Sequence, residues 1–127
     1  MKVKEILESR KAPITIHAEK HLQDAMRLLI DHKIGSLIVV DDEDKPSGII
    51  TEHDIFHLAY RFRGDMMDMV VGDNMTKNLV LASPDDSLNK IADIMMEKHI
   101  RHIPITDDSK KLLGIISIRD LVGYLRG

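Results

Sequence analysis

The spacing of apolar residues along the chain changes in a fixed order, and each spacing predicts one kind of secondary structure. Apolar residues recur every three or four positions over residues 22–30 and 88–96, which predicts two amphipathic helices. Short β-rich runs bounded by polar residues predict strands over residues 14–16, 36–40, 79–81 and 102–106. A polar turn and a return strand, at residues 48–50 and 114–116, predict a hairpin in each half, and a second helix follows each hairpin.

These elements occur twice because the sequence contains an internal repeat. Gly48 and Asp54 each have an identical counterpart 66 positions later, with further matches around them. Each copy has the order β-α-β-β-α, and a domain of about 60 residues buries only a marginal core. We therefore predict an α+β fold in which two pseudo-symmetric copies pack as one compact module. The copies are placed at residues 1–62 and 71–127, with residues 63–70 as a short connection.

Composition and charge narrow the classes of function. The 127 residues are 43% hydrophobic and 31% charged, a mixture typical of a soluble globular protein. The net charge of −3 and an aromatic content of 3% disfavour nucleic-acid binding, which uses positive charge and aromatic stacking. The chain has no Cys, which excludes disulfides, thiolate metal sites and a Cys nucleophile and fits a reducing compartment.

The beginning of the chain alternates charged and apolar residues and contains no apolar stretch of signal-peptide length. The longest apolar runs, such as residues 37–40, are far shorter than the roughly 20 residues that span a bilayer. We therefore expect a cytoplasmic protein without membrane insertion.

The junction between return strand and second helix carries the motif Gly-Ile-Ile-[Thr/Ser]-x-x-Asp in both copies. Its polar members are Thr51 with Asp54 and Ser117 with Asp120. One interpretation is a helix cap, because a hydroxyl followed three residues later by a carboxylate is a variant of the capping box. The other is a ligand site, since a helix N-terminus can hold phosphate and a nearby carboxylate can accept hydrogen bonds from the two hydroxyls of a ribose. The residues alone leave both interpretations open.

Taken together, the two copies resemble a pair of cystathionine-β-synthase (CBS) domains. The resemblance rests on residues 48–54 and 114–120, and on residues 82–88 and 100–107, and it covers nearly the whole chain. It implies an intramolecular pair, often called a Bateman module, with two related clefts that bind adenosine-containing ligands. The implied ligands are AMP, ADP and ATP, with S-adenosylmethionine and NAD as further candidates.

The resemblance also implies which residues form the clefts. In the family, each cleft takes its hydroxyl and ribose carboxylate from one copy and much of its adenine pocket from strands of the other. By this resemblance, cleft one consists of Thr51, His53, Asp54, Leu79, Val80, Arg101, His102, Ile103 and Pro104. Cleft two consists of Pro13, Ile14, Ser36, Leu37, Ile38, Ser117, Arg119 and Asp120.

The two implied clefts differ in positive charge. Arg101 and His102 match positions where family members place basic phosphate contacts, whereas the other copy has Gly35 and Ser36 there. We therefore expect cleft one to be the better phosphate site, although Arg119 adds a charge to cleft two. A simpler interpretation of the basic pair is a solvated strand edge, where charged side chains discourage pairing with another sheet.

Metal binding and catalysis receive weaker support. His53 and His57 have the i, i+4 spacing that places two ligands on one helical face, but the sequence offers no obvious third ligand, so we predict no metal site. No nucleophile, base and orienting group occur together, so we predict that the chain is not an enzyme and requires no cofactor. The Met residues around the connection and in the helix at residues 88–96 are interpreted as core residues, with a partner contact as the alternative.

The sequence thus predicts a stand-alone regulatory module that senses an adenosine-containing ligand and passes its occupancy to an effector protein in trans. Members of the family commonly form homodimers, and the predicted helices are candidates for that interface. The main alternative is a structural dimerisation module with empty clefts, in which the repeated motif only caps helices. An enzyme that depends on a metal or a nucleotide is the remaining alternative.

Overall fold

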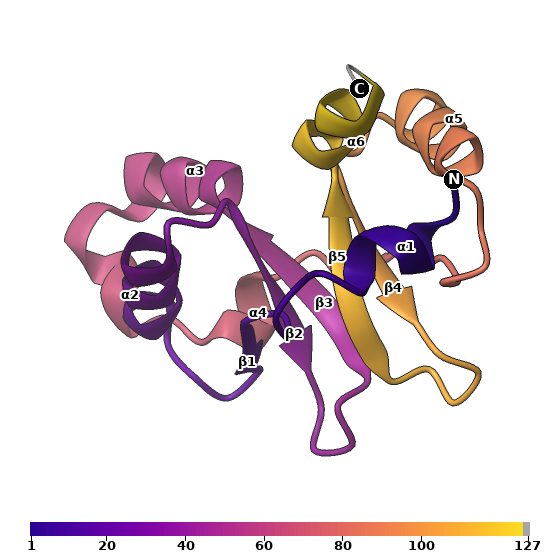
Figure 1. Cartoon of the computed structure of the whole chain (residues 1–127). Coiled ribbons are helices and arrows are strands. Elements are labelled where there is room, and N and C mark those ends of the chain that lie inside the picture. Colours follow the sequence, from indigo (N-terminus) through magenta and orange to yellow (C-terminus); the bar gives the residue numbers. More distant parts are fainter. Residues whose placement is uncertain (126–127) are drawn as a thin grey trace. The chain divides into compact units, whose positions relative to one another are not determined.

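The computed structural model describes residues 1–125 as two compact units, each built of helices packed on a small sheet (Figure 1). The first, called here the β1–β3 unit, comprises Ile14–Leu79. The second, the β4–β5 unit, combines Met1–Pro13 with the chain from Val80 onward. The units therefore divide the chain at residues 13/14 and 79/80, so the opening residues of the chain belong to the unit formed by the second copy.

The β1–β3 unit contains a three-stranded sheet in the order β1-β2-β3. Strand β1 is parallel to β2, and β2 is antiparallel to β3. Its elements are β1 (Thr15–His17), α2 (Leu22–His32), β2 (Ser36–Val40), β3 (Pro46–Thr51), α3 (Glu52–Phe62), the 3-10 helix η1 (Arg63–Asp68) and α4 (Val71–Asn74). The strands, the first helix and the hairpin predicted for the first copy are confirmed.

The β4–β5 unit contains an antiparallel two-stranded sheet. Its elements are α1 (Val3–Leu7), α5 (Leu88–Lys98), β4 (His102–Thr106), β5 (Leu112–Ser117) and α6 (Ile118–Leu125). Ser87 caps α5, because its hydroxyl accepts a hydrogen bond of 3.1 Å from the N–H of Lys90. The helix and the hairpin predicted for the second copy are confirmed.

The strand predicted at residues 79–81 is wrong. Only Ala82 pairs with β4: its N–H donates to the carbonyl of Pro104 at 3.1 Å, and its carbonyl accepts from Thr106 at 3.0 Å. In the β1–β3 unit the corresponding ladder has three pairs and includes Ile38. Pro104 replaces Ile38 in the repeat and has no N–H to donate, so the ladder cannot extend from Ala82 toward Val80.

Each unit takes its first short helix from the other copy of the repeat. In the β1–β3 unit, the N–H of Val71 on α4 donates to the carbonyl of Lys20 at 2.8 Å. In the β4–β5 unit, the N–H of Val3 on α1 donates to the carbonyl of Asp86 at 2.9 Å. Lys20 and Asp86 are 66 positions apart, so the same docking contact occurs twice with the helices exchanged between copies.

The repeated glycine of the junction motif makes room for this exchanged segment. A Cβ on Gly114 would lie 2.6 Å from a methyl group of Leu7 at the end of α1. A Cβ on Gly48 would collide with Met75, the residue that follows α4, and would lie 3.0 Å from the carbonyl oxygen of Thr76. At Gly48 a larger residue is opposed by Met75 and by a backbone carbonyl, whereas at Gly114 it would require the flexible end of the Leu7 side chain to shift.

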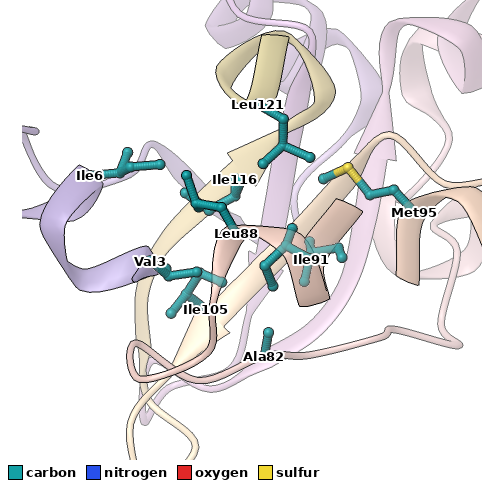
Figure 2. Close-up of a cluster of buried hydrophobic side chains, with 10 residues drawn as sticks. Val3, Ile6, Ala82, Leu88, Ile91, Met95, Ile105, Ile116 and Leu121 are labelled. Carbon is teal, nitrogen blue, oxygen red and sulfur yellow. The ribbon is translucent and has the colours of Figure 1, made fainter. Parts of the chain in front are cut away.

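A separate hydrophobic cluster stabilises each unit. In the β1–β3 unit, α2 packs its buried face on Leu37 and Val39 of β2. In the β4–β5 unit, side chains of α1, α5, β4, β5 and α6 converge on one cluster (Figure 2). The core interpretation of Met holds for Met66 and Met95, which are buried, whereas Met96 is 75% exposed. No helix among residues 1–125 is long and apolar enough to cross a membrane.

Candidate functional site

Both copies of the junction motif form the same reciprocal pair of hydrogen bonds. In the Thr51 junction, defined as Thr51 and Asp54 at the start of α3, the N–H of Asp54 donates to Thr51 Oγ1 at 3.1 Å, and the N–H of Thr51 donates to Asp54 Oδ2 at 2.9 Å. In the Ser117 junction, defined as Ser117 and Asp120 at the start of α6, the corresponding distances are 3.2 and 2.7 Å. The capping interpretation of the motif is therefore confirmed in both copies.

The other carboxylate oxygen distinguishes the two junctions. Among the described residues, no donor lies within hydrogen-bond distance of Asp54 Oδ1. Asp120 instead forms a two-pronged ion pair with Arg10, in which Nη2 donates to Oδ1 and Nη1 donates to Oδ2 at 3.1 Å. Arg10 Nη1 also donates to the carbonyl of Ile115 at 3.2 Å. Capping thus leaves one oxygen of Asp54 available, whereas a guanidinium engages both oxygens of Asp120.

The ion pair shifts the pKa of both partners. Burial raises the pKa of Asp120, but hydrogen bonds from Arg10 and from the N–H of Ser117 outweigh burial and leave the pKa below its ordinary value of 3.8. The hydrogen bond to Asp120 raises the pKa of Arg10 further. Asp120 therefore stays ionised at pH values at which an ordinary Asp takes up a proton.

This pKa shift predicts a specific loss of stability in acid. A carboxyl whose pKa is lower in the folded state than in the unfolded state stabilises the fold above the unfolded pKa, and this contribution is lost as the pH falls through the folded value. We expect the free energy of unfolding of the wild type to fall more steeply below about pH 4 than that of Arg10→Gln, measured by urea titration. Asp41 and Asp86 also have lowered pKa values, but the wild type and Arg10→Gln both retain these residues, so their contribution cancels in the comparison. Equal slopes would contradict the assigned role of Arg10.

Strand register brings together residues that the sequence analysis assigned to different clefts. Ser36 pairs with Thr51 across β2 and β3, and His102 pairs with Ser117 across β4 and β5. The carbonyl of Arg101 accepts the N–H of Ile118 at 2.9 Å, which fixes Arg101 beside the start of α6. The basic pair therefore lies within the same unit as Ser117. Its assignment to cleft one, together with Thr51, stays a prediction.

The remaining cleft residues divide into buried, exposed and partly exposed groups. Leu37 and Ile103 belong to the hydrophobic clusters, and Ile38 and Pro104 are also buried, so these strand residues can offer a ligand mainly their backbone. Arg101, Arg119 and His53 are exposed. The four partly exposed residues flank the two places where the chain passes from one unit to the other: Pro13, Ile14, Leu79 and Val80.

The histidine pair does not form a metal centre within the described residues. His53 and His57 lie one turn apart on α3 with their Nε2 atoms 3.0 Å apart, close enough for one ring to donate a hydrogen bond to the other. No group of three or more His, Asp or Glu side chains in residues 1–125 is placed to hold a metal ion. This geometry is explained by a hydrogen bond between the two rings, whose direction depends on their tautomers.

Two shallow depressions occur in the β1–β3 unit. One, of about 310 Å³, is lined by Leu29, Ile30, Lys33, Ile34 and Glu52. The other, of about 280 Å³, is lined by Thr15, Ile16, His17, Lys20, Asp24, Arg27 and Leu28. Neither is lined by Thr51, Asp54, Ser117 or Asp120, although Glu52, which follows Thr51 in the motif, lines the first.

Sequence reasoning missed Arg10. It lies in the loop after α1, 110 positions before its partner Asp120, so no local motif connects the two residues. One signal was present: the first copy is about two residues longer than the second around residues 9–11, and Arg10 is in the middle of this insertion. The contact that the insertion makes becomes visible only when the loop is placed against β5.

Comparison with known proteins places this architecture in a family. The family model of the CBS domain matches residues 3–61 and again residues 68–127. The chain is 37% identical over 109 residues to an inosine-5'-monophosphate dehydrogenase of Nitrosopumilus maritimus, a match that covers 86% of this chain and 21% of that enzyme. It spans between 22% and 62% of three other curated relatives.

Solved structures agree over nearly the full length of the chain. The CBS-domain protein ATU1752 from Agrobacterium tumefaciens has a TM-score of 0.90 at 28% identity, with 98% of this chain and 99% of that chain covered. The CBS domain pair of protein MJ0100, solved in complex with 5'-methylthioadenosine and S-adenosyl-L-methionine, has a TM-score of 0.90 at 31% identity, with 100% of this chain and 97% of that chain covered. The chain therefore belongs to the CBS-domain family and consists of a pair of CBS domains.

Proposed function

We propose that this CBS domain pair binds an adenosine-containing ligand at its strand-to-helix junctions and acts as a regulatory sensor. The observation that carries the proposal is the Thr51 junction, in which capping occupies Asp54 Oδ2 while Oδ1 has no donor among residues 1–125. A half-buried carboxylate with an available oxygen at a helix N-terminus is suited to accept hydrogen bonds from ribose hydroxyls. The first N–H groups of the helix favour a phosphate nearby.

The chemical class of the ligand is supported by the MJ0100 pair. That pair is 31% identical to this chain over its full length and was solved with two adenosine-containing ligands. Ribose and adenine are common to both of those ligands and to AMP, ADP, ATP and NAD, so we propose the adenosine moiety as the recognised part. The candidate ligands differ in the group attached to the 5' carbon of the ribose, so recognition of that group would select among them.

We infer a regulatory role because both copies match the CBS-domain model and because the similar MJ0100 pair was solved with two adenosine-containing ligands. Ligand binding can act on an effector protein only if the ligand binds two arrangements of the module with different affinity. We propose that such a difference in affinity links ligand occupancy to the effector.

The proposal is tested by thermal unfolding with AMP, ADP, ATP, NAD and S-adenosylmethionine, with GMP as the control. A ligand at ~100 times its Kd stabilises the folded state by about 2.7 kcal/mol, which for a protein of this size raises the Tm by several degrees. We expect at least one adenosine ligand to raise the Tm and GMP to leave it unchanged. If no adenosine ligand does so, the structural dimerisation module with empty sites becomes the better account.

We also propose that the module forms a homodimer through its helices. In the β1–β3 unit, helix α3 has no buried side chain, and its Phe56 and Tyr60 are 74% and 83% exposed. Ile30 of α2 is also largely exposed. Exposed aromatic side chains on one helix are typical of protein interfaces, and a second copy of the chain would remove them from water.

Substituting both aromatic residues is expected to produce a monomer. In Phe56→Ser/Tyr60→Ser the helix is unchanged in length, but its aromatic contact area is lost. Light scattering after gel filtration should give twice the chain mass of 14.4 kDa for the wild type and the chain mass for the variant. The matched control is Asp42→Ser/Glu43→Ser, which changes exposed residues of the turn between β2 and β3, outside the helices. A wild type that elutes as a monomer would refute the dimer proposal.

A further inference from the structure

The loop after α1 places a cation against the carboxylate of one junction only. Arg10 reaches both oxygens of Asp120 and the carbonyl of Ile115, while its side chain remains 33% exposed. The Asp120 side chain is 20% exposed. The guanidinium therefore lies at the edge of the Ser117 junction, in contact with the carboxylate and open to solvent on one side.

In the β1–β3 unit, a backbone contact occupies the position that Arg10 occupies in the β4–β5 unit. Ile49, the counterpart of Ile115, exchanges two backbone hydrogen bonds with Thr76, at 2.9 and 3.0 Å. Its carbonyl is therefore paired with a backbone N–H, where the carbonyl of Ile115 pairs with Arg10. Among the described residues, Asp54 has no ion pair. The cation is thus a feature of the Ser117 junction and not of the repeat.

A ribose entering the Ser117 junction would compete with Arg10. A carboxylate offers roughly four acceptor positions, and Asp120 already accepts hydrogen bonds from the N–H of Ser117 and from two guanidinium nitrogens. Two ribose hydroxyls need two of these positions, so at least one guanidinium hydrogen bond must be released. A partly buried guanidinium that loses a carboxylate contact needs another anion, and phosphate matches its two-pronged geometry.

We propose that Arg10 makes the Ser117 junction selective for phosphorylated adenosine ligands over uncharged ones. Arg10 thus determines specificity. Its hydrogen bonds to Asp120 compete with the hydroxyls of an uncharged nucleoside and lower the affinity for it. A nucleotide instead offers Arg10 a phosphate to bind, which raises the affinity for the nucleotide. Arg101 and Arg119 lie beside the same helix start and add positive charge there. This inference rests on the proposed function and specifies the ligand chemistry of one of its two sites.

The test compares AMP with adenosine by calorimetric titration of the full chain. Asp54→Asn weakens the Thr51 junction and serves as the common background, so that binding reports on the Ser117 junction. Arg10→Gln removes the cation, and Arg10→Lys keeps a positive charge but cannot make two parallel hydrogen bonds to one carboxylate or phosphate. Lys11→Gln removes a neighbouring exposed cation and is the matched control. The Tm of each variant without ligand shows that it is folded.

We expect Arg10→Gln to lower the ratio of AMP affinity to adenosine affinity by about tenfold or more, because a charge-assisted contact to phosphate is lost and a competitor for Asp120 is removed. Arg10→Lys should lie between the wild type and Arg10→Gln, and Lys11→Gln should leave the ratio unchanged. A purely structural role of Arg10 would change the Tm without changing the ratio, and that result overturns the proposal.

Two other outcomes distinguish this inference from the proposed function. If the wild type binds AMP but the Asp54→Asn background binds neither ligand, the Ser117 junction is no nucleotide site; the inference fails while the proposed function survives at the Thr51 junction. If the wild type binds neither AMP nor adenosine nor any other ligand of the panel, both fail.

Discussion

Asp54→Asn should weaken the binding of an adenosine ligand to the β1–β3 unit by roughly 10- to 150-fold, the range expected when a charged acceptor of hydrogen bonds is removed from a ligand. The physical reason is that Asn keeps the size of Asp54 and an oxygen that can still accept the N–H of Thr51, but it has no negative charge to offer the ribose hydroxyls. Calorimetric titration with the ligand identified by thermal unfolding measures the change.

The matched control is Asp24→Asn in the same unit. Asp24 makes the same kind of capping contact at the start of α2, where its Oδ2 accepts the N–H of His21 at 3.0 Å, but it is not part of the motif. Loss of a cap costs about 0.5–2 kcal/mol of stability wherever it occurs. Equal affinity losses in the two variants would assign the effect to helix stability and would count against ribose binding at Asp54.

Asp120→Ala is expected to have the second large effect, a loss of about 1–3 kcal/mol in the free energy of unfolding. Removing this carboxylate deprives the N–H of Ser117 of its acceptor and leaves the partly buried Arg10 guanidinium without its ion pair. The partial exposure of both side chains keeps the loss below that of a fully buried pair. Urea denaturation at neutral pH measures it.

Asp54→Ala provides the comparison, because it removes the same cap without an ion pair, and its cost is expected to stay within about 0.5–2 kcal/mol. A double-mutant cycle with Arg10→Ala isolates the interaction of the pair. We expect a coupling of about 1 kcal/mol between Arg10 and Asp120 and no coupling between Arg10 and Asp54. Additive effects of Arg10→Ala and Asp120→Ala would show that the ion pair does not stabilise the unit.

Local chemistry made most secondary structure predictable. The two copies of the motif predicted caps at the starts of α3 and α6, and both caps have the expected reciprocal hydrogen bonds. The strand predicted at residues 79–81 failed because the decisive residue, Pro104, lies in the partner strand and withholds an N–H. The strand propensity of a segment does not include the hydrogen-bond donors that the adjacent strand can supply.

Features that depend on contacts between distant segments could not be predicted from the sequence. The exchange of α1 and α4 between the copies leaves no local signal, although the close packing on Gly48 and Gly114 is its consequence. Arg10 was visible only as part of an insertion, because its partner Asp120 is 110 positions away. His102 lies opposite Ser117 because of the register of the β4–β5 hairpin. The length of the turn sets this register more accurately than the pattern of apolar residues does.

The central claim is that an adenosine ligand binds at the two strand-to-helix junctions. The most direct measurement is a titration of the isotope-labelled full chain with AMP, followed residue by residue through its backbone amide NMR signals. We predict that the largest shifts fall on the amides of residues 51–54 and 117–120, with the amide of Arg10 also affected. Saturable shifts confined to other residues, such as those lining the depression at Arg27 and Leu28, or the absence of shifts at millimolar AMP, would contradict the claim.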